Sequence, residues 1–170
     1  MIFLSIGSNL NSIFGDRFAN IRKTIQLLKL ENIIPLKCSN YFETPSYPNK
    51  KYPKFINVVL SVTFDDTPES MIKKISLIEK NMGRLKTLKN APRICDIDII
   101  DFNRIQITTK STTLPHPRAH YRNFVLMPLA QINPSWRHPI SNKKIDILIK
   151  NLPIQSRNEI TRLNESAILK

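Results

Sequence analysis

The order of its extended and helical segments limits most strongly what this chain can fold into. Four stretches have the pattern of β-strands, at residues 2–6, 33–42, 55–64 and 94–102. The third alternates strictly between an apolar face and a mixed face, as a strand with one buried side does. Helical spacing of apolar residues follows Asp16 and Thr67, whose side chains are preferred at helix starts. This order predicts an α+β fold with a ferredoxin-like core, in which helices flank a mainly antiparallel sheet.

A proline-rich loop and a C-terminal extension complete the expected organisation. Three prolines between residues 43 and 54 exclude a helix there, and loops of such length tend to be functional. An apolar element follows at residues 124–132, and the last thirty residues carry one amphipathic patch before they become polar. We therefore expect a functional domain of residues 1–140 and an extension of residues 141–170 that packs on it or trails from it.

Glycine is scarce, and this scarcity excludes two common nucleotide sites. The chain has three glycines, Gly7, Gly15 and Gly83, whereas a P-loop and a dinucleotide-binding turn each need closely spaced glycines. A nucleotide bound by this protein must therefore be held by another kind of structure.

The chain is strongly basic, with 26 Lys and Arg against 13 Asp and Glu and a formal net charge of +13. One interpretation is a polyanionic partner, either nucleic acid or a phosphorylated small molecule. The other is a general bias in composition. We favour this bias for most of the surface, because the lysines are scattered and no run of five like charges occurs.

The chain lacks the sequence signals of secretion and of membrane insertion. Its first residues include no basic leader, and no apolar stretch approaches the ~20 residues needed to span a bilayer. Cys38 and Cys95 are far apart and belong to no C-x-x-C pair, so a disulfide scaffold and a zinc ribbon are both disfavoured. We expect a cytoplasmic protein with two buried, reduced thiols and no membrane partner.

Asp96 and Asp98 are the strongest chemical signal in the sequence. On a strand, residues i and i+2 lie on the same face, about 6.6–6.8 Å apart. Two carboxylates so placed repel each other unless a cation or a proton lies between them. Mg²⁺ fits best, because it takes one or two carboxylates together with substrate phosphates. The alternative is an edge strand that carries acids against aggregation, and the pair alone does not decide between the two.

Two basic clusters lie near these acids in the sequence. The first is a segment with four cationic residues, Arg84, Lys86, Lys89 and Arg93. The second is His116, held between two prolines and followed by Arg118 and Arg122. Phosphoryl transfer needs cations around the migrating group, and both clusters supply them. The alternatives are a solvated loop and a structural histidine. His120 and His138 lack comparable neighbours, and we expect them at the surface.

Asn57 indicates a site for a flat heterocycle. It lies on the mixed face of its strand, near Thr44 and Pro45, and its amide offers both donors and an acceptor to a ring edge. Phe55 and Phe124 have rings that stack on such a ligand. The alternative for both phenylalanines is ordinary packing in the core.

These motifs together resemble the 6-hydroxymethyl-7,8-dihydropterin pyrophosphokinase (HPPK) family. The most specific is Pro92-Arg93-Ile94-Cys95-Asp96-Ile97-Asp98-Ile99, similar to the family's P-R-x-x-D-x-D-I signature. The resemblance covers about residues 2 to 135. Its other motifs are Leu4-Ser5-Ile6-Gly7-Ser8-Asn9-Leu10, Gly15-Asp16-Arg17, Tyr41-Phe42-Glu43-Thr44-Pro45, Phe55-Ile56-Asn57, Ile78-Glu79, Gly83-Arg84, Pro115-His116-Pro117-Arg118 and Arg122-Asn123-Phe124-Val125-Leu126 with Pro128-Leu129.

The resemblance implies transfer of pyrophosphate from ATP to the hydroxymethyl oxygen of the pterin, with release of AMP. It implies two Mg²⁺ ions on Asp96 and Asp98, and a catalytic group made of these acids with Arg84 and Arg93. The residues it implies at the ATP site are Glu79, Arg84, Arg93, Ile99, His116 and Arg122. Those it implies at the pterin site are Thr44, Pro45, Phe55, Asn57 and Phe124.

The chain departs from the family just before Pro92, where Asn90-Ala91 replaces the usual Trp-Gly in a loop one residue shorter. The family's aromatic side chain helps to cover the pterin, so we expect weaker closure here. This difference leaves open a catalytically impaired relative that binds a nucleotide, and the basic charge of a ferredoxin-like domain leaves open an RNA-binding protein. The second lacks its usual paired aromatics in this sequence. We expect a monomer that acts on small molecules and binds no nucleic acid.

Overall fold

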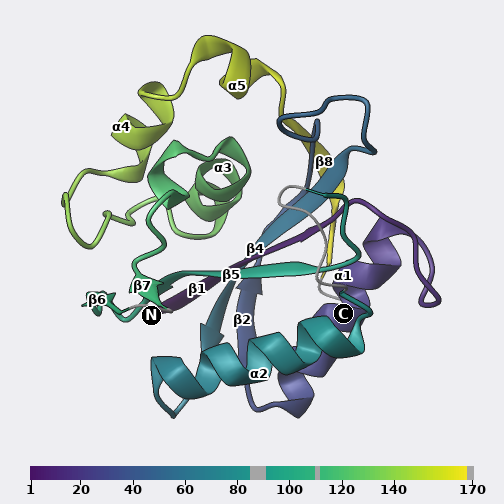
Figure 1. Ribbon diagram of the computed structural model, residues 1–170. Coiled ribbons are helices and arrows are strands. Elements are labelled where there is room, and N and C mark those ends of the chain that lie inside the picture. Colours follow the sequence, from purple (N-terminus) through teal and green to yellow (C-terminus); the bar gives the residue numbers. More distant parts are fainter. Residues whose placement is uncertain (85–90, 110–111, 168–170) are drawn as a thin grey trace.

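The computed structural model describes residues 1–84, 91–109 and 112–167 (Figure 1). The segment 85–90, which contains Lys86, Lys89 and Asn90, lies outside the described residues. In chain order the elements are β1 (Ile2–Ser8), α1 (Arg17–Leu30), β2 (Ile34–Cys38), β3 (Asn40–Thr44), β4 (Phe55–Thr63), α2 (Pro68–Asn81), β5 (Asp96–Phe102), β6 (Ile107–Thr108), β7 (Thr113–Leu114), a 3₁₀ turn (Ala119–Tyr121), α3 (Asn123–Ile132), α4 (Ile145–Lys150), α5 (Ile154–Asn158) and β8 (Thr161–Ser166).

One sheet organises the molecule. Within the described ranges it has six strands in the order β5-β1-β4-β3-β8, with β2 also paired to β4. Every neighbouring pair is antiparallel. The connection through α1 joins β1 to β2 on the far side of β4, and the connection through α2 joins β4 to β5 on the far side of β1. This split βαβ arrangement, used twice, is the ferredoxin-like topology that the sequence predicted.

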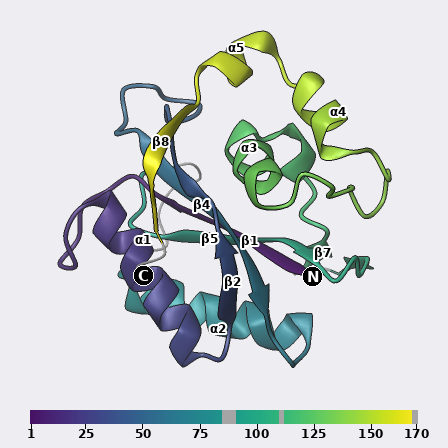
Figure 2. The same ribbon diagram turned by 180° about the vertical axis from the view of Figure 1, so that it is seen from behind.

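The sheet is covered by helices on both faces, with α1 and α2 on one side and α3 and α4 on the other (Figures 1 and 2). The first core lies under α1 and α2 and contains Leu4, Ile6 and Leu60. The second lies under α3 and contains Phe3, Val59 and Trp136. In the register of the sheet, the residues between those of the first core point to the α3 side.

Both helices of the first layer begin where the sequence predicted. The Asp16 carboxylate accepts a hydrogen bond from the Ala19 amide at 2.8 Å and caps α1. The Thr67 hydroxyl accepts from the Ser70 amide at 3.2 Å and caps α2, with Pro68 in the first helical position. Gly83 follows α2 with a φ of +86°, a backbone conformation that glycine adopts without strain.

The extended segment predicted at residues 33–42 is divided into two strands at Ser39. The Ser39 amide donates to the Val59 carbonyl, and the Ser39 hydroxyl accepts from the Val59 amide, both at 3.0 Å. A side-chain oxygen thus replaces one backbone partner of the ladder, so the edge bends there without leaving a donor unsatisfied.

The end of the chain contains a strand that the sequence did not predict. Strand β8 pairs with β3 at the edge of the sheet, and most of its residues are exposed. Because neither face of β8 is well buried, its sequence lacks the apolar alternation that marks β4. Helix α4 lies against α3, and its residues Ile145 and Leu148 belong to the second core.

The expectation that His138 lies at the surface was wrong. Its side chain is buried beside Trp136, with ring centroids 5.9 Å apart, and beside His120 at 5.0 Å. The His138 Nδ1 atom accepts from the amides of Ile140 and Ser141, so the ring closes the turn that precedes α4. Trp136 is two residues away in the chain, but His120 belongs to the 3₁₀ turn Ala119–Tyr121, so the burial of His138 depends on contact with a distant segment.

None of the helices in the described part of the chain is both long enough and apolar enough to cross a lipid bilayer.

Candidate active site

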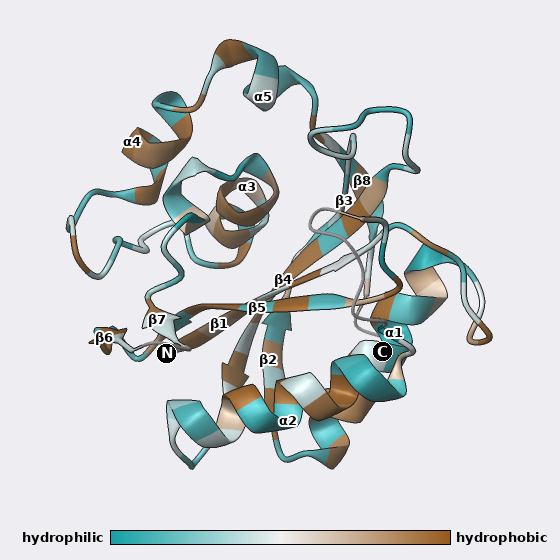
Figure 3. Cartoon of the chain, in the orientation of Figure 1, coloured by the Kyte–Doolittle hydropathy of each residue, from teal (hydrophilic) through white to brown (hydrophobic). Residues whose placement is uncertain are grey.

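The predicted carboxylate pair lies at the polar start of β5. Asp96 and Asp98 point to the α3 side of the sheet, while Ile97 and Ile99 pack in the first core. Their side chains are 28% and 31% exposed, so both remain within reach of solvent. Figure 3 shows β5 changing from hydrophilic at this start to hydrophobic further along.

Two arginines from either end of the basic segment converge on Asp96. The Asp96 Oδ1 atom lies 3.0 Å from Arg84 Nη2 and 2.9 Å from Arg93 Nη1. Arg84 also pairs with Glu79 near the end of α2. The structure thus brings together four residues, Glu79, Arg84, Arg93 and Asp96, that are separated by up to 17 positions in the chain.

Arg122 and His116 are the side-chain partners of Asp98. Arg122 Nη1 lies 2.7 Å from Asp98 Oδ2, and His116 Nε2 lies 3.6 Å from the same oxygen. His116 accepts the Arg118 amide at Nδ1, so its neutral ring carries the proton on Nε2, toward the carboxylate. Burial lowers the pKa of His116 and the neighbouring Asp98 opposes that shift. The His116 amide donates to the Ile100 carbonyl, which fixes this loop against β5.

Glu79 links the cluster of charged side chains to the backbone of β5. It is 9% exposed, and its Oε1 atom accepts the Ile97 amide at 2.9 Å as well as Arg84. Burial raises the pKa of the Glu79 carboxyl, while the Ile97 amide and Arg84 act in the opposite direction. Glu79 therefore joins α2, β5 and a phosphate-binding candidate at one point.

The predicted heterocycle site lies two strands away on the same face. Asp96, Gly7 and Asn57 are aligned across β5, β1 and β4. The buried Asn57 amide donates to Thr44 Oγ1 at 3.0 Å, which fixes its orientation. A Cβ atom at Gly7 would lie 3.1 Å from Asn57 Oδ1 and 3.5 Å from the Phe55 ring. Glycine at this position therefore leaves the surface between the Asn57 amide and the carboxylates free of a side chain, which gives a flat floor for a ligand.

Comparison with known proteins identifies the relatives of this chain. The model of the 7,8-dihydro-6-hydroxymethylpterin-pyrophosphokinase (HPPK) family matches residues 3–134. The 2-amino-4-hydroxy-6-hydroxymethyldihydropteridine pyrophosphokinase of Aquifex aeolicus is 34% identical over 145 residues, which are 85% of this chain and 87% of that protein. The chain belongs to the HPPK family.

Some HPPK relatives are much longer than this chain. The folic acid synthesis protein FOL1 of Dictyostelium discoideum is 36% identical over 153 residues, which are 90% of this chain and 22% of that protein. The chain thus spans about a fifth of its length. Among solved structures, wild-type HPPK-DHPS of Plasmodium falciparum superimposes with a TM-score of 0.69 over 95% of this chain and 47% of that one, at 17% identity. That likeness shows the fold.

Not every residue that the HPPK resemblance implied joins the cluster. Ile99 is buried in the first core, so its side chain points away from the carboxylates. Phe124 and Pro45 are half-buried, and the Arg122 guanidinium lies 5.3 Å from the Phe124 ring centroid. This cation-π contact places Phe124 beside the phosphate-binding candidates, at the start of α3.

Sequence reasoning did not single out Asn9, although it is 1% exposed and makes hydrogen bonds to two segments of the candidate site. The signal available was its position, directly after the buried strand β1 in a polar turn. The same reasoning missed Ser46, which is 3% exposed inside the proline-rich loop.

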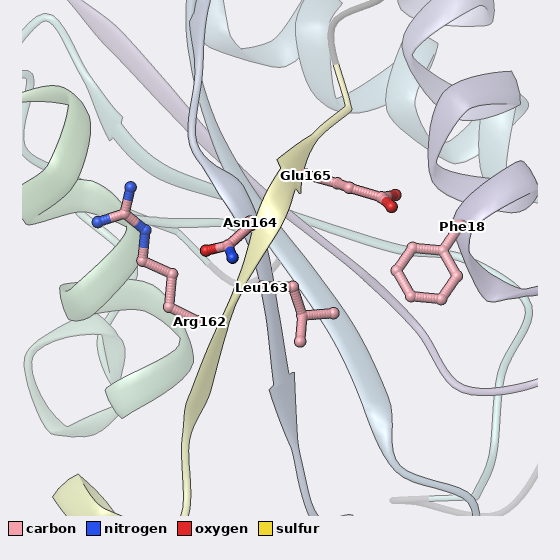
Figure 4. Close-up of a pocket in the computed structure, with 5 residues that line it drawn as sticks. All are labelled: Phe18, Arg162, Leu163, Asn164 and Glu165. Atoms are coloured by element: carbon pink, nitrogen blue, oxygen red, sulfur yellow. The ribbon is translucent and has the colours of Figure 1, made fainter.

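A pocket of about 350 Å³ lies elsewhere, along β8 (Figure 4). It is lined by Phe18, Arg162, Leu163, Asn164 and Glu165. Because β8 and β5 occupy opposite edges of the sheet, this pocket is separate from the carboxylate cluster.

Proposed function

We propose that this protein transfers the pyrophosphoryl group of ATP to 6-hydroxymethyl-7,8-dihydropterin. The hydroxymethyl oxygen forms a bond to the β-phosphorus and loses its proton, while the bond from the β-phosphorus to the α-phosphate oxygen breaks. The products are AMP and the pterin diphosphate, an intermediate of folate synthesis. Membership in the HPPK family supports this reaction.

One observation carries the proposal, which is the convergence of three arginines and one histidine on the two acids of β5. Arg84, Arg93, Arg122 and His116 all lie within 3.6 Å of Asp96 or Asp98. Each of these side chains can exchange its carboxylate partner for a phosphate oxygen, and arginine binds phosphate in the same forked geometry. The cluster thus offers several groups that bind phosphate oxygens. Developing negative charge during transfer is stabilised by the same groups.

We infer that Asp96 and Asp98 hold two Mg²⁺ ions together with the phosphates of ATP. The donor set fits, since both acids are partly exposed, share one face and offer the oxygen ligands that magnesium prefers. Bound magnesium would neutralise the triphosphate and orient it for in-line attack. The arginines then have phosphates to bind instead of carboxylates, so the charges of the cluster remain balanced.

The pterin site follows from Asn57 and its neighbours. The Asn57 amide is oriented by Thr44, and Phe55 and Phe124 are half-buried aromatic rings near the cluster. A flat heterocycle on the Gly7 floor would place its substituent toward β5, because Gly7 lies between Asn57 and Asp96 in the register. Positioning of this kind supplies much of the rate enhancement in a two-substrate transfer. We further propose that the protein acts as a monomer in the cytoplasm.

The proposal is tested by measuring AMP in a coupled assay with ATP, Mg²⁺ and the dihydropterin. We expect AMP formation that requires all three, is abolished by excess EDTA and returns with Mg²⁺. Asp98→Ala should abolish it, whereas Asp146→Ala, at an exposed acid on α4, should leave it unchanged. Binding of ATP without AMP formation by the unsubstituted protein would overturn the proposal and favour a catalytically impaired relative.

A further inference from the structure

Asn9 occupies a point where three segments of the site meet. It follows β1 in the chain, is 1% exposed, and contacts both the loop between β3 and β4 and the segment before β5. It is not among the groups that would touch a substrate in the proposed reaction. Its side chain nevertheless uses both of its polar atoms on those two segments.

The bonds of Asn9 to the segment before β5 hold Arg93. The Arg93 backbone amide donates to Asn9 Oδ1 at 2.7 Å, and the backbone N–H of Asn9 donates to the Arg93 carbonyl at 3.1 Å. Both backbone polar groups of Arg93 are therefore bound by one residue. The Arg93 side chain, fixed in this way, reaches Asp96.

The bonds of Asn9 to the proline-rich loop hold its two ends together. Asn9 Nδ2 donates to Ser46 Oγ and to the Pro53 carbonyl, each at 3.1 Å, and the Ser46 hydroxyl donates to the same carbonyl at 2.6 Å. Ser46 directly follows Pro45, which is a candidate pterin residue. A movement of this loop is thus transmitted to Arg93 through the planar side-chain amide of Asn9, and a movement of Arg93 is transmitted to the loop in the same way.

We propose that Asn9 is a positioning residue that couples the pterin site to the phosphate site by joining the 46–53 loop to Arg93. This inference rests on the proposed function and gives a structural reason why the binding of one substrate strengthens the binding of the other. When the phosphates of ATP order Arg93, the Asn9 amide holds the pterin-side loop in its binding conformation. The pterin then binds to a loop that is already ordered, and it binds more tightly.

Asn20 provides a matched control for the loss of a buried amide. It is fully buried, and its Nδ2 atom also donates to one carbonyl, that of Leu10, and to one hydroxyl, that of Ser8. Among the described residues, the hydrogen bonds of its side chain go to Ser8, Leu10 and Ser12 and not to the proline-rich loop or Arg93. Asn20→Asp therefore removes equivalent donors without cutting the proposed connection.

The experiment measures the dissociation constant of 6-hydroxymethyl-7,8-dihydropterin by calorimetry, with and without Mg²⁺ and α,β-methylene ATP. The unsubstituted protein should bind the pterin roughly tenfold more tightly with the nucleotide, within the usual range of coupling between sites. Asn9→Asp keeps an acceptor for the Arg93 amide and loses both donors, so the ratio should fall below about twofold. Asn20→Asp should keep the ratio of the unsubstituted protein.

Each outcome decides a separate question. A normal ratio in Asn9→Asp, or a ratio of one in the unsubstituted protein, overturns the role of Asn9 while the proposed reaction stands. An unsubstituted protein that binds neither ligand overturns both. Should Asn9→Asp fail to fold, Ser46→Ala removes only the hydroxyl between Asn9 and Pro53, and we expect it to reduce the ratio at nearly unchanged melting temperature. An unchanged ratio in that variant contradicts the inference.

Discussion

The two ends of β5 use the same acid in opposite ways. At the start of the strand, Asp96 and Asp98 are about 30% exposed and paired with arginines. Near its end, Asp101 is 2% exposed and accepts two neutral donors, the Trp136 indole at 2.9 Å and the Arg104 amide at 2.8 Å. An irregularity in the pairing with β1 between these positions brings Asp101 to the α3 side as well.

The difference shows which carboxylates are available for chemistry. The partners of Asp101 are a buried indole and a backbone amide, which are held in place by the fold and cannot exchange Asp101 for a ligand. The closest partners of Asp96 and Asp98 are long, partly exposed arginine side chains, which can release the carboxylate and bind a phosphate instead. A buried acid with fixed neutral donors stabilises the fold, whereas an accessible acid with exchangeable cations can bind ligands.

The largest expected effect is that of Asp98→Asn, which tests the start of β5, where the partners of the acids can exchange. The substitution preserves shape but removes the charge that pairs with Arg122 and that magnesium needs. We expect the rate of AMP formation to fall about 10²–10³-fold, as when one preorganised electrostatic group is lost. Thermal unfolding should change little, because the site remains open to water. A variant with more than a tenth of the original rate would contradict the division between the two ends.

The same substitution at Asp101 should have the opposite profile. Trp136 and Arg104 donate to different oxygens of Asp101, and asparagine offers only one oxygen, so one buried donor would face an amide NH₂ group. We expect Asp101→Asn to lower the free energy of unfolding by about 1–3 kcal/mol, measured by urea denaturation. The rate per folded molecule should remain within about threefold, so a much greater loss of activity would assign Asp101 to the site.

The smallest expected effect is a pH dependence of the free energy of unfolding that comes from the histidines near Asp101, at the buried end of β5. Burial lowers the pKa of His138 and of the neighbouring His120, with Asp101 opposing the shift at His138. Below the ordinary histidine pKa of about 6.5, the unfolded chain therefore binds more protons than the folded one, and stability falls as the pH falls. Between pH 7.5 and 5.5 we expect a loss of about 1 kcal/mol from these rings. His138→Gln should reduce the slope, and an unchanged slope would show that other groups titrate.

The sequence predicted the fold well where local pattern and burial coincide. The alternation of β4 and the capping residues Asp16 and Thr67 lead directly to elements that the structure contains. Strand β8 was missed because an edge strand with exposed faces has no apolar alternation to find. His138 was misplaced because its burial depends on packing against His120, which is 18 residues away, as well as on the nearby Trp136.

The candidate site was predictable in its residue types and not in its connections. Two acids on one strand face and nearby arginines are visible in the chain, and the structure places three of these arginines within 3.0 Å of the acids. The bridge at Asn9 is not visible, because its partners Ser46, Pro53 and Arg93 are 37, 44 and 84 residues away.

By itself the sequence determined the periodicity of the strands and helices, the pair of acids on one strand face and the absence of a glycine-rich phosphate loop. These follow from short-range geometry, since i and i+2 share a face whatever the rest of the chain does. Only the tertiary structure decided which cation pairs with which acid, that Ile99 faces the core, and that the Asn9 side chain joins the proline-rich loop to Arg93. Such choices depend on contacts between distant segments, which form only when the sheet brings β1, β4 and β5 side by side.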